Sequence, residues 1–321
     1  MILATTRCED LRIHSTETPG EHIHLRKKYA GETPASPGKA ILFVHGATYP
    51  GAMFDVAGSS WLDHAVADGY AAYALDVRGY GASTRPAALD APPRDNKPFA
   101  RAESAVADIT DCVATIRERT GVETIDIVGW SWGTMTSGMY AASQPGSINR
   151  LVLFAPVYCC HRADRIAGLA DRDDPSQLRM LGAYRTENID DASTRWNSEI
   201  TAADPDDWRD PAILEAWFTA MLKNEPGDAV RAPNGVLVDL WEAFNERPRY
   251  DAGAIKVPTL VIRGSADATA IRADGLTLFD ALGSEHKQYV EIAHTTHFAL
   301  LERRAPQLFE SVSRFLSGSQ K

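Results

Sequence analysis

Cysteine is scarce in this sequence of 321 residues, which contains four: Cys8, Cys112, Cys159 and Cys160. No two of them form a C-x-x-C pair, so neither a disulfide framework nor a zinc site is indicated. Cys112 falls within a helical pattern, where a buried structural cysteine is the common case and a catalytic cysteine is the alternative. This cysteine usage is typical of a protein from a reducing compartment.

Long apolar runs and a targeting segment are also missing. No stretch approaches the roughly 20 unbroken apolar residues that a membrane span needs. The segment Met1–Asp10 lacks the basic and apolar regions of a secretion signal. We therefore expect a soluble cytoplasmic protein that has no membrane partner.

Basic residues are in the minority. Lys and Arg number 33 against 43 Asp and Glu, which gives a net charge of −10. Because binding to nucleic-acid phosphates needs a basic surface, this balance argues against a nucleic-acid partner. Hydrophobic residues make up 44% and charged residues 24%, which excludes a disordered, collagenous or coiled-coil chain. The length predicts one large domain or a domain with a sizeable insertion.

Short apolar runs alternate with helical patterns along most of the chain. This alternation is typical of a mostly parallel sheet flanked by helices, so the predicted fold class is α/β. The clearest predicted strands are Ile41–Val44, Tyr70–Val77, Thr124–Val128, Leu151–Phe154, Thr259–Ile262 and Gln288–Ile292. Apolar residues spaced three and four apart predict a helix that ends at Gly121, and a second helix is predicted to begin at Pro306.

Residues 157–254 break this alternation. They lack clear strand patterns, are rich in Asp and Arg, and contain four of the seven tryptophans: Trp196, Trp208, Trp217 and Trp241. The dipeptide Asp210-Pro211 predicts a capped helix with an apolar stripe that includes Trp217. We favour the interpretation that this stripe is the segment's own core. The alternative is that its aromatic residues face a substrate cavity.

The segment Gly129-Trp130-Ser131-Trp132-Gly133 carries the strongest local signal for chemistry. It lies between a predicted strand and a stretch of small residues suited to a closely packed helix, which is the context of a nucleophile elbow. So sharp a turn forces Ser131 into a strained backbone conformation that costs about 1–3 kcal/mol. The residues two positions away on either side must then be small. Because the pentapeptide alone is a modest signal, an ordinary Gly/Ser turn is the alternative.

A serine hydroxyl becomes a good nucleophile only when a base accepts its proton, and that base needs a carboxylate to orient it. In the elbow architecture the chain order is serine, acid and then histidine. Asp267 follows one predicted strand and His297 follows the next, so both are expected at the carboxyl edge of the sheet. His294 is the alternative base. An acid after the strand Leu151–Phe154 would be the alternative carboxylate, but none follows that run at once.

Together these segments resemble the α/β-hydrolase superfamily. The motifs that carry the resemblance stand in the family's order, and they are His45-Gly46, Asp76–Ser83, the elbow around Ser131, Val257–Asp267, and His297 with Glu302. The match covers about residues 22–156 and 255–317. The resemblance implies an α/β-hydrolase fold with a core of residues 1–156 and 255–321. It also implies a helical cap of residues 157–254, inserted after the sixth strand.

The resemblance implies roles for individual residues. Ser131 would be the nucleophile, His297 the general base and later the acid, and Asp267 the orienting carboxylate. His45 and Glu302 would be structural. Such a site needs no metal ion and no organic cofactor.

Two backbone N–H groups would hold the oxyanion, those of Trp132 and Ala47, with Thr48 as the alternative to Ala47. Further residues near the elbow and in the cap are expected to contact the substrate: Thr48, Tyr49, Trp130 and Trp217. The cap also contains His161, Arg162 and Arg165, which could bind an anionic substrate group. We favour the interpretation that these cations form a solvated face, balanced by nearby aspartates.

The functional hypothesis is therefore a serine hydrolase that cleaves a small carboxylic ester, or an amide, lactone or thioester, through an acyl-enzyme intermediate. The alternatives on the same scaffold are a carbon–carbon bond hydrolase, a cofactor-free oxygenase, and a ligand-binding receptor with little turnover. The expected partner is a small molecule with an apolar acyl or aromatic part. The sequence gives no indication of the oligomeric state.

Overall fold

The computed structural model describes residues 6–31 and 38–318, and its centre is an eight-stranded sheet. In chain order the strands of this sheet are β1 (Thr6–His14), β2 (His22–Ala30), β3 (Ala40–Val44), β6 (Ala71–Asp76), β7 (Ile125–Trp130), β8 (Ile148–Phe154), β11 (Thr259–Gly264) and β12 (Lys287–Ile292). All six predicted strands are present, with slightly different ends. The predicted fold class is confirmed.

Across the sheet the strand order is β1-β2-β6-β3-β7-β8-β11-β12. Six neighbouring strands of this order run parallel, namely β6, β3, β7, β8, β11 and β12. β1 and β2 are antiparallel to their neighbours. The sequence did not predict β1 and β2. β1 is an edge strand that is exposed along most of its length, so it carries little apolar pattern. In β2 the buried side includes Lys27 beside Ile23 and Leu25, which obscures the alternation.

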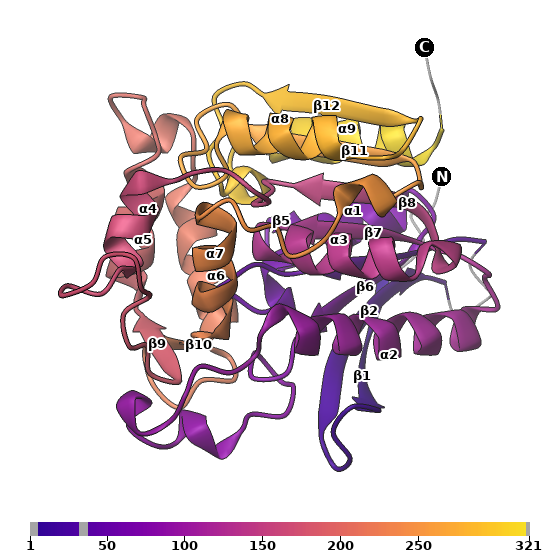
Figure 1. Ribbon diagram of the computed structural model, residues 1–321. Coiled ribbons are helices and arrows are strands. Elements are labelled where there is room, and N and C mark those ends of the chain that lie inside the picture. Colours follow the sequence, from indigo (N-terminus) through magenta and orange to yellow (C-terminus); the bar gives the residue numbers. More distant parts are fainter. Residues whose placement is uncertain (1–5, 32–37, 319–321) are drawn as a thin grey trace.

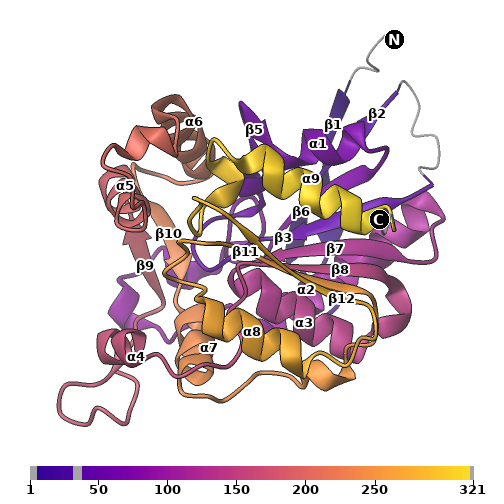
Figure 2. The ribbon, with the colours of Figure 1, turned by 90° about the horizontal axis from the view of Figure 1, so that it is seen from above.

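Helices cover both faces of the sheet (Figure 2). One face carries α2 (Ala102–Thr120), α3 (Trp132–Ser143) and α8 (Arg272–Ala281), and the other carries α1 (Trp61–Ala67) and α9 (Ala305–Leu316). Both helices predicted for the core are confirmed. The residue after α2 is Gly121, in the left-handed conformation with φ 74°, and Pro306 lies in the first turn of α9.

Residues 157–254, here called the inserted segment, lie between β8 and β11. Their regular elements are α4 (Ala163–Leu169), β9 (Tyr184–Glu187), α5 (Ile189–Asn197), α6 (Pro211–Leu222), β10 (Val230–Pro233) and α7 (Gly235–Phe244). Figure 1 shows these elements gathered at one end of the sheet. The division of the chain into a core and a cap at these boundaries stays a prediction.

The expectation that the inserted segment lacks strands is wrong. β9 and β10 pair antiparallel in a two-stranded ribbon. Each has four residues, and their sequences, YRTE and VRAP, contain too few apolar residues to show a strand pattern. The capped helix is confirmed, because the Asp210 side chain accepts a hydrogen bond from the backbone N–H of Ala212 at the start of α6.

The remaining regular elements are short. Two strands, β4 (Asp55–Val56) and β5 (Ser59–Ser60), form a small antiparallel ribbon. Short 3₁₀ turns occur at Gly51–Phe54, Ala87–Leu89, Pro93–Asp95, Pro145–Ser147, Pro205–Asp207, Ala252–Ala254 and Ala299–Leu301. Within residues 6–31 and 38–318, no helix combines the length and apolar character needed to cross a bilayer.

Candidate active site

The elbow at the end of β7 has the backbone that the sequence predicts. Ser131 links β7 to α3 with φ 57° and ψ −122°, a conformation that few residues other than glycine adopt. The close packing around it explains the two flanking glycines. A Cβ atom on Gly129 would lie 2.4 Å from the carbonyl oxygen of Gly133. A Cβ atom on Gly133 would lie 2.3 Å from the carbonyl oxygen of Val44 in β3.

Three side chains from different loops form one hydrogen-bonded chain at the carboxyl ends of β7, β11 and β12. The Ser131 Oγ lies 2.9 Å from Nε2 of His297, and Nδ1 of His297 lies 2.9 Å from Oδ2 of Asp267. The other carboxylate oxygen of Asp267 accepts hydrogen bonds from the backbone N–H groups of Thr269 and Ala270. A carboxylate only accepts hydrogen bonds, so Nδ1 carries the imidazole proton and Nε2 is free to accept one from the serine.

The alternative base lies elsewhere. His294 is exposed, and its ring packs edge-on against Trp208 with centroids 5.7 Å apart. Glu302 instead fixes the loop that carries His297. It accepts hydrogen bonds from the backbone N–H and hydroxyl of Thr296 and from the indole N–H of Trp196. Burial raises the pKa of Glu302. The structural interpretation of Glu302 is therefore supported.

His297 is also held through its backbone. Its N–H donates to Oε2 of Glu199 at 2.9 Å, and its carbonyl accepts from the indole Nε1 of Trp130 at 3.1 Å. The second carboxylate oxygen of Glu199 accepts from the hydroxyl of Thr269, two residues after Asp267. Sequence reasoning missed Glu199, because it follows α5 in the inserted segment and belongs to no motif.

The loop after β3 approaches the elbow from the other side. His45 is buried, its Nδ1 hydrogen-bonds the carbonyl of Gly46, and its Nε2 accepts from the backbone N–H of Val77. Burial lowers the pKa of His45, so it is a neutral structural group, as the sequence predicts. The carbonyl of Ala47 accepts hydrogen bonds from Tyr80 and Arg185, both at 2.9 Å.

The predicted oxyanion donors lie on either side of the nucleophile. Trp132 is the first residue of α3, where backbone N–H groups have no acceptor within the helix. Ala47 and Thr48 both line the cavity beside Ser131. Thr48 also accepts a hydrogen bond from Arg185 through its hydroxyl. The assignment of these residues as oxyanion donors stays a prediction.

The aromatic residues predicted to contact the substrate divide into two groups. Tyr49 and Trp130 line the cavity. Trp217 does not, and this expectation is corrected, because its buried ring packs against Tyr49, Trp196 and Phe298 at centroid distances of 4.7, 5.7 and 5.6 Å. The favoured interpretation of the α6 stripe as core is therefore the one that holds for Trp217.

Trp132 is likewise packed away from the cavity lining. Its side chain is fully buried, and its indole N–H donates to Asp239 at 3.2 Å. Only the backbone of Trp132 is therefore available to the proposed chemistry.

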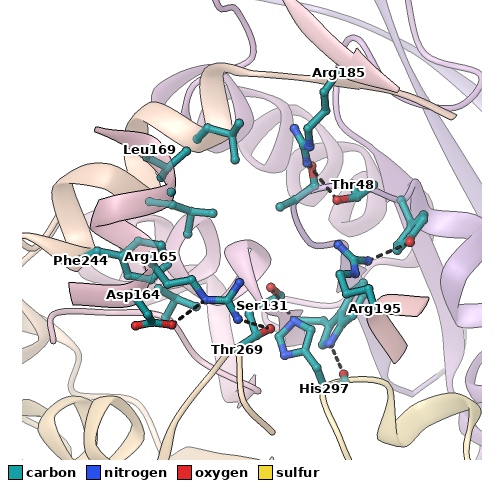
Figure 3. Close-up of a pocket in the computed structure, with 17 residues that line it drawn as sticks. Thr48, Ser131, Asp164, Arg165, Leu169, Arg185, Arg195, Phe244, Thr269 and His297 are labelled. Carbon is teal, nitrogen blue, oxygen red and sulfur yellow. Dashed lines mark hydrogen bonds and ion pairs between the residues drawn. The ribbon is translucent and has the colours of Figure 1, made fainter. Parts of the chain in front are cut away.

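The cavity itself has a volume of about 350 Å³ and lies between the strand ends and the inserted segment (Figure 3). Ser131 and His297 lie at its lower edge in Figure 3. Its apolar lining comes mainly from the inserted segment, through Val157, Leu169, Leu237, Leu240 and Phe244. This size lies at the lower end of the range typical of small-molecule pockets.

Three arginines line the same cavity, and we call them the arginine cluster: Arg165, Arg185 and Arg195. Arg165, interpreted above as part of a solvated face, contacts Asp164 and Thr269 within the cavity wall. Arg195 donates to the Tyr49 hydroxyl at 2.8 Å. Neither Arg185 nor Arg195 belongs to a sequence motif, so the sequence offered no signal for them.

Arg162 behaves differently from the arginine cluster. It is buried, pairs with Asp164 and donates to the backbone carbonyls of Ala268 and Thr269. It therefore ties the inserted segment to the loop that carries Asp267. His161 is exposed and does not line the cavity.

Within the part of the chain that the structure describes, no group of three His, Cys, Asp or Glu side chains could hold a metal ion. Cys112 is buried among core residues, and burial raises its pKa, which agrees with the structural interpretation. The expectation that the chemistry needs no cofactor stays a prediction.

A mostly parallel sheet with a serine elbow and an acid and a histidine on the following strand ends defines the α/β-hydrolase class. Comparison with known proteins agrees. The profile of the alpha/beta hydrolase fold family matches residues 39–304. The chain therefore belongs to the alpha/beta hydrolase fold family, and we class it as a hydrolase.

Individual relatives are distant. The AB hydrolase superfamily protein YisY of Bacillus subtilis is 23% identical over 293 residues, which cover 88% of this chain and 92% of YisY. A thermophilic esterase from Thermogutta terrifontis superposes with a TM-score of 0.65 at 17% identity, covering 97% of this chain and 98% of the esterase. The enol-lactonase of Burkholderia xenovorans superposes with a TM-score of 0.63 at 20% identity, covering 93% and 97% of the two chains. At these identities the structural likeness concerns the fold.

Proposed function

We propose that this protein is a serine hydrolase of small carboxylic esters that works through an acyl-enzyme intermediate. The observation that carries the proposal is the hydrogen-bonded chain from Ser131 through His297 to Asp267, with two distances of 2.9 Å. These are the distances that a nucleophile, its base and an orienting carboxylate need. Amides, lactones and thioesters would react by the same steps.

In the first step the Ser131 hydroxyl gives its proton to Nε2 of His297 while Oγ attacks the ester carbonyl carbon. The carbonyl π electrons move to the oxygen, which becomes a tetrahedral oxyanion. His297 becomes an imidazolium, which the carboxylate of Asp267 stabilises through Nδ1–H. The bonds from Glu199 and Trp130 to the backbone of His297 keep the ring in place during this transfer.

The oxyanion would be held by the backbone N–H of Trp132 and by that of Ala47 or Thr48. Removing one such donor typically costs about 3–4 kcal/mol of transition-state stabilisation. The N-terminal end of α3 adds a favourable dipole for negative charge. Support for this arrangement comes from the position of Trp132 at the first turn of α3 and of Ala47 in the cavity lining.

Collapse of the intermediate breaks the bond to the alcohol oxygen, which takes the proton from Nε2 of His297 and leaves. A water molecule then gives a proton to the same Nε2 and attacks the acyl carbon. The second tetrahedral intermediate releases the carboxylic acid and returns the proton to Ser131. The enzyme is regenerated, and one ester and one water have become one acid and one alcohol.

Labelling with a fluorophosphonate tests the activated serine directly. We expect rapid labelling with one adduct per chain, mapped by peptide mass to Ser131 and absent from the Ser131→Ala variant. Turnover of short-chain 4-nitrophenyl esters should accompany it. Failure of a well-folded wild type to be labelled would contradict the proposal. Labelling without turnover would favour a receptor on this scaffold instead.

Cleavage of a carbon–carbon bond in a ring-fission product is a second candidate. The observation in its favour is that Arg165 lines the cavity and could bind the carboxylate of a dienoate. Such substrates are coloured, so hydrolysis would appear as a loss of visible absorbance. A faster turnover of these compounds than of 4-nitrophenyl esters would favour this candidate over ester hydrolysis.

A further inference from the structure

The lining of the cavity has an unbalanced charge. Among the described residues it contains the arginine cluster, Arg165, Arg185 and Arg195, and a single carboxylate, Asp164. This positive surface lies inside a chain whose net charge is −10. A positive cavity in an acidic protein points to a ligand of negative charge, because no general excess of basic residues explains it.

Arg185 is the most unusual member of the arginine cluster. Its terminal nitrogens donate only to neutral acceptors, which are the carbonyls of Pro233 and Ala47, the side-chain oxygen of Asn234 and the hydroxyl of Thr48. Among the described residues no carboxylate oxygen lies within 4.0 Å of its guanidinium nitrogens. Burial lowers the pKa of Arg185. The side chain is only partly exposed, and a charge that is partly removed from water is stabilised when a ligand supplies a counterion.

The other two members have donors to spare. Arg195 gives one terminal nitrogen to Tyr49 and to Glu187, at 2.8 and 3.3 Å, and its Nε is buried without a hydrogen-bond acceptor among the described residues. The Nε of Arg165 is buried as well and makes no hydrogen bond among the described residues, although a carboxylate oxygen of Asp164 lies 3.5 Å away. Figure 3 shows the guanidinium groups of Arg165 and Arg195 reaching toward the cavity from opposite sides. Unused buried donors mark positions where an acceptor belongs.

Three further carboxylates lie near the arginine cluster but do not form part of the cavity surface. Glu187, Glu199 and Asp267 lie outside the cavity lining. Each already accepts hydrogen bonds, Glu187 from Tyr49, Glu199 from the His297 backbone and Asp267 from the His297 ring. An anion that enters the cavity would therefore meet guanidinium groups rather than these carboxylates.

The carboxylates nearest to the arginine cluster do not balance its charge. Asp164, the partner of Arg165, is also bound by Arg162, and Glu187 is the partner of Arg195. Among the described residues, Arg185 has no carboxylate oxygen within 4.0 Å. The cavity therefore keeps an excess of positive charge for an anionic group. The planar guanidinium also matches a carboxylate in geometry.

We propose that the substrate of this enzyme is an ester that carries a free carboxylate, and that the arginine cluster binds this carboxylate while the ester carbonyl lies at Ser131. The proposal rests on the proposed function for the ester half of the substrate. The cavity of about 350 Å³ has room for a short dicarboxylic acid monoester.

Binding to the Ser131→Ala variant tests the carboxylate site without turnover. The probes are monomethyl adipate, which is an anion at pH 7, and dimethyl adipate, which is neutral. Calorimetry should show that the monoester binds at least about tenfold more tightly, the usual gain from a charge-assisted hydrogen bond. In this background Arg165→Gln and Arg195→Gln should each reduce the preference several-fold. Arg172→Gln, a control at an exposed position outside the cavity, should leave it unchanged.

Arg185→Gln should abolish the preference, but this change also removes hydrogen bonds from the loop that carries Ala47 and Thr48. The Arg165 and Arg195 variants keep the test decisive if Arg185→Gln does not fold. Equal affinities for the two esters, or no binding of either at millimolar concentration, would overturn the proposal. A preference for the monoester in a protein whose wild type cleaves no ester would leave the carboxylate site standing and overturn the proposed function instead.

Discussion

The two walls of the cavity are built on opposite principles. On the sheet side the groups around Ser131 are saturated with hydrogen bonds, since His297 is bound through its ring and through both backbone polar groups, and Asp267 uses both carboxylate oxygens. On the side of the inserted segment, the buried Nε of Arg195 has no acceptor among the described residues, and the buried Nε of Arg165 has only an ion pair with Asp164 at 3.5 Å. Side chains whose hydrogen bonds are all satisfied are held in fixed positions, whereas donors without acceptors are free to bind a ligand. From this comparison we expect the reaction to take place at the first wall and the choice of substrate to depend on the second.

The largest effect expected on the saturated wall comes from the proposed nucleophile and base. Ser131→Ala and His297→Ala should each lower kcat by about 10⁴-fold or more, because the two residues act as one unit. For the same reason the double variant should be no slower than the slower single variant. Steady-state kinetics with a 4-nitrophenyl ester measure this. Losses that multiply in the double variant would show that the two side chains act independently.

Next in size is a steric prediction about the elbow. In Gly133→Ala the new Cβ would lie 2.3 Å from the carbonyl oxygen of Val44. Val44 is paired with β7 in the centre of the sheet and Gly133 lies in the first turn of α3, so neither backbone can move freely. We expect a loss of about 2–3 kcal/mol in the free energy of unfolding, measured by urea denaturation. Gly146→Ala is the matched control, because its Cβ would have no atom within 4 Å, and its effect should stay within about 0.5 kcal/mol.

The contrast between the two walls of the cavity also explains which parts of the site could be predicted from sequence. The position of Ser131 follows from a local strand, turn and helix pattern, and the positions of Asp267 and His297 follow from where parallel strands end. Such features are visible along the chain. The same local logic predicts the C-terminal end of α2 at Gly121 and the start of α9 at Pro306.

The second wall could not be predicted in this way. Arg185 and Arg195 reach the cavity through the packing of β9 and α5 against the loop after β3, which no local pattern encodes. Trp217 shows the same limit from the other direction. Its place in an apolar stripe was visible, but whether the stripe faced the cavity or the core depended on the neighbours Trp196 and Phe298.

Glu199 breaks the simple division, because it is a residue of the inserted segment that serves the saturated wall. Its carboxylate holds the backbone N–H of His297 and the hydroxyl of Thr269. In Glu199→Gln only one side-chain oxygen remains for these two donors, so His297 loses part of its support. We expect kcat to fall by about tenfold with little change in KM, since small displacements of a base are costly.

The control for this prediction is Glu215→Gln, which changes an exposed carboxylate on α6 and should leave kcat unchanged. A purely structural role for Glu199 would lower the unfolding temperature without separating kcat from KM. A rise in KM at constant kcat would place Glu199 among the substrate contacts instead.

The smallest expected effect concerns the point where the inserted segment leaves the core. Asp274 on α8 is buried and accepts hydrogen bonds from the backbone N–H groups of Tyr158 and Cys159. Burial outweighs these bonds and the nearby Arg162, and raises the pKa of Asp274 to about 6. Between the unfolded pKa near 3.8 and the folded pKa of about 6, the folded state therefore holds a proton that the unfolded state has lost.

Because the folded pKa is the higher one, the stabilising effect of this proton is complete below the unfolded pKa near 3.8 and is lost as the pH rises through about 6. Between pH 5 and pH 7 the loss should be about 1 kcal/mol. Asp274→Asn keeps one oxygen acceptor but does not titrate, so its unfolding free energy should fall less than that of the wild type over this range. Urea denaturation of both proteins at the two pH values isolates Asp274 from the other buried acids. If the unfolding free energies of the two proteins change in parallel, Asp274 is ionised in the folded protein over this pH range. The inserted segment would then join the core through a charged carboxylate.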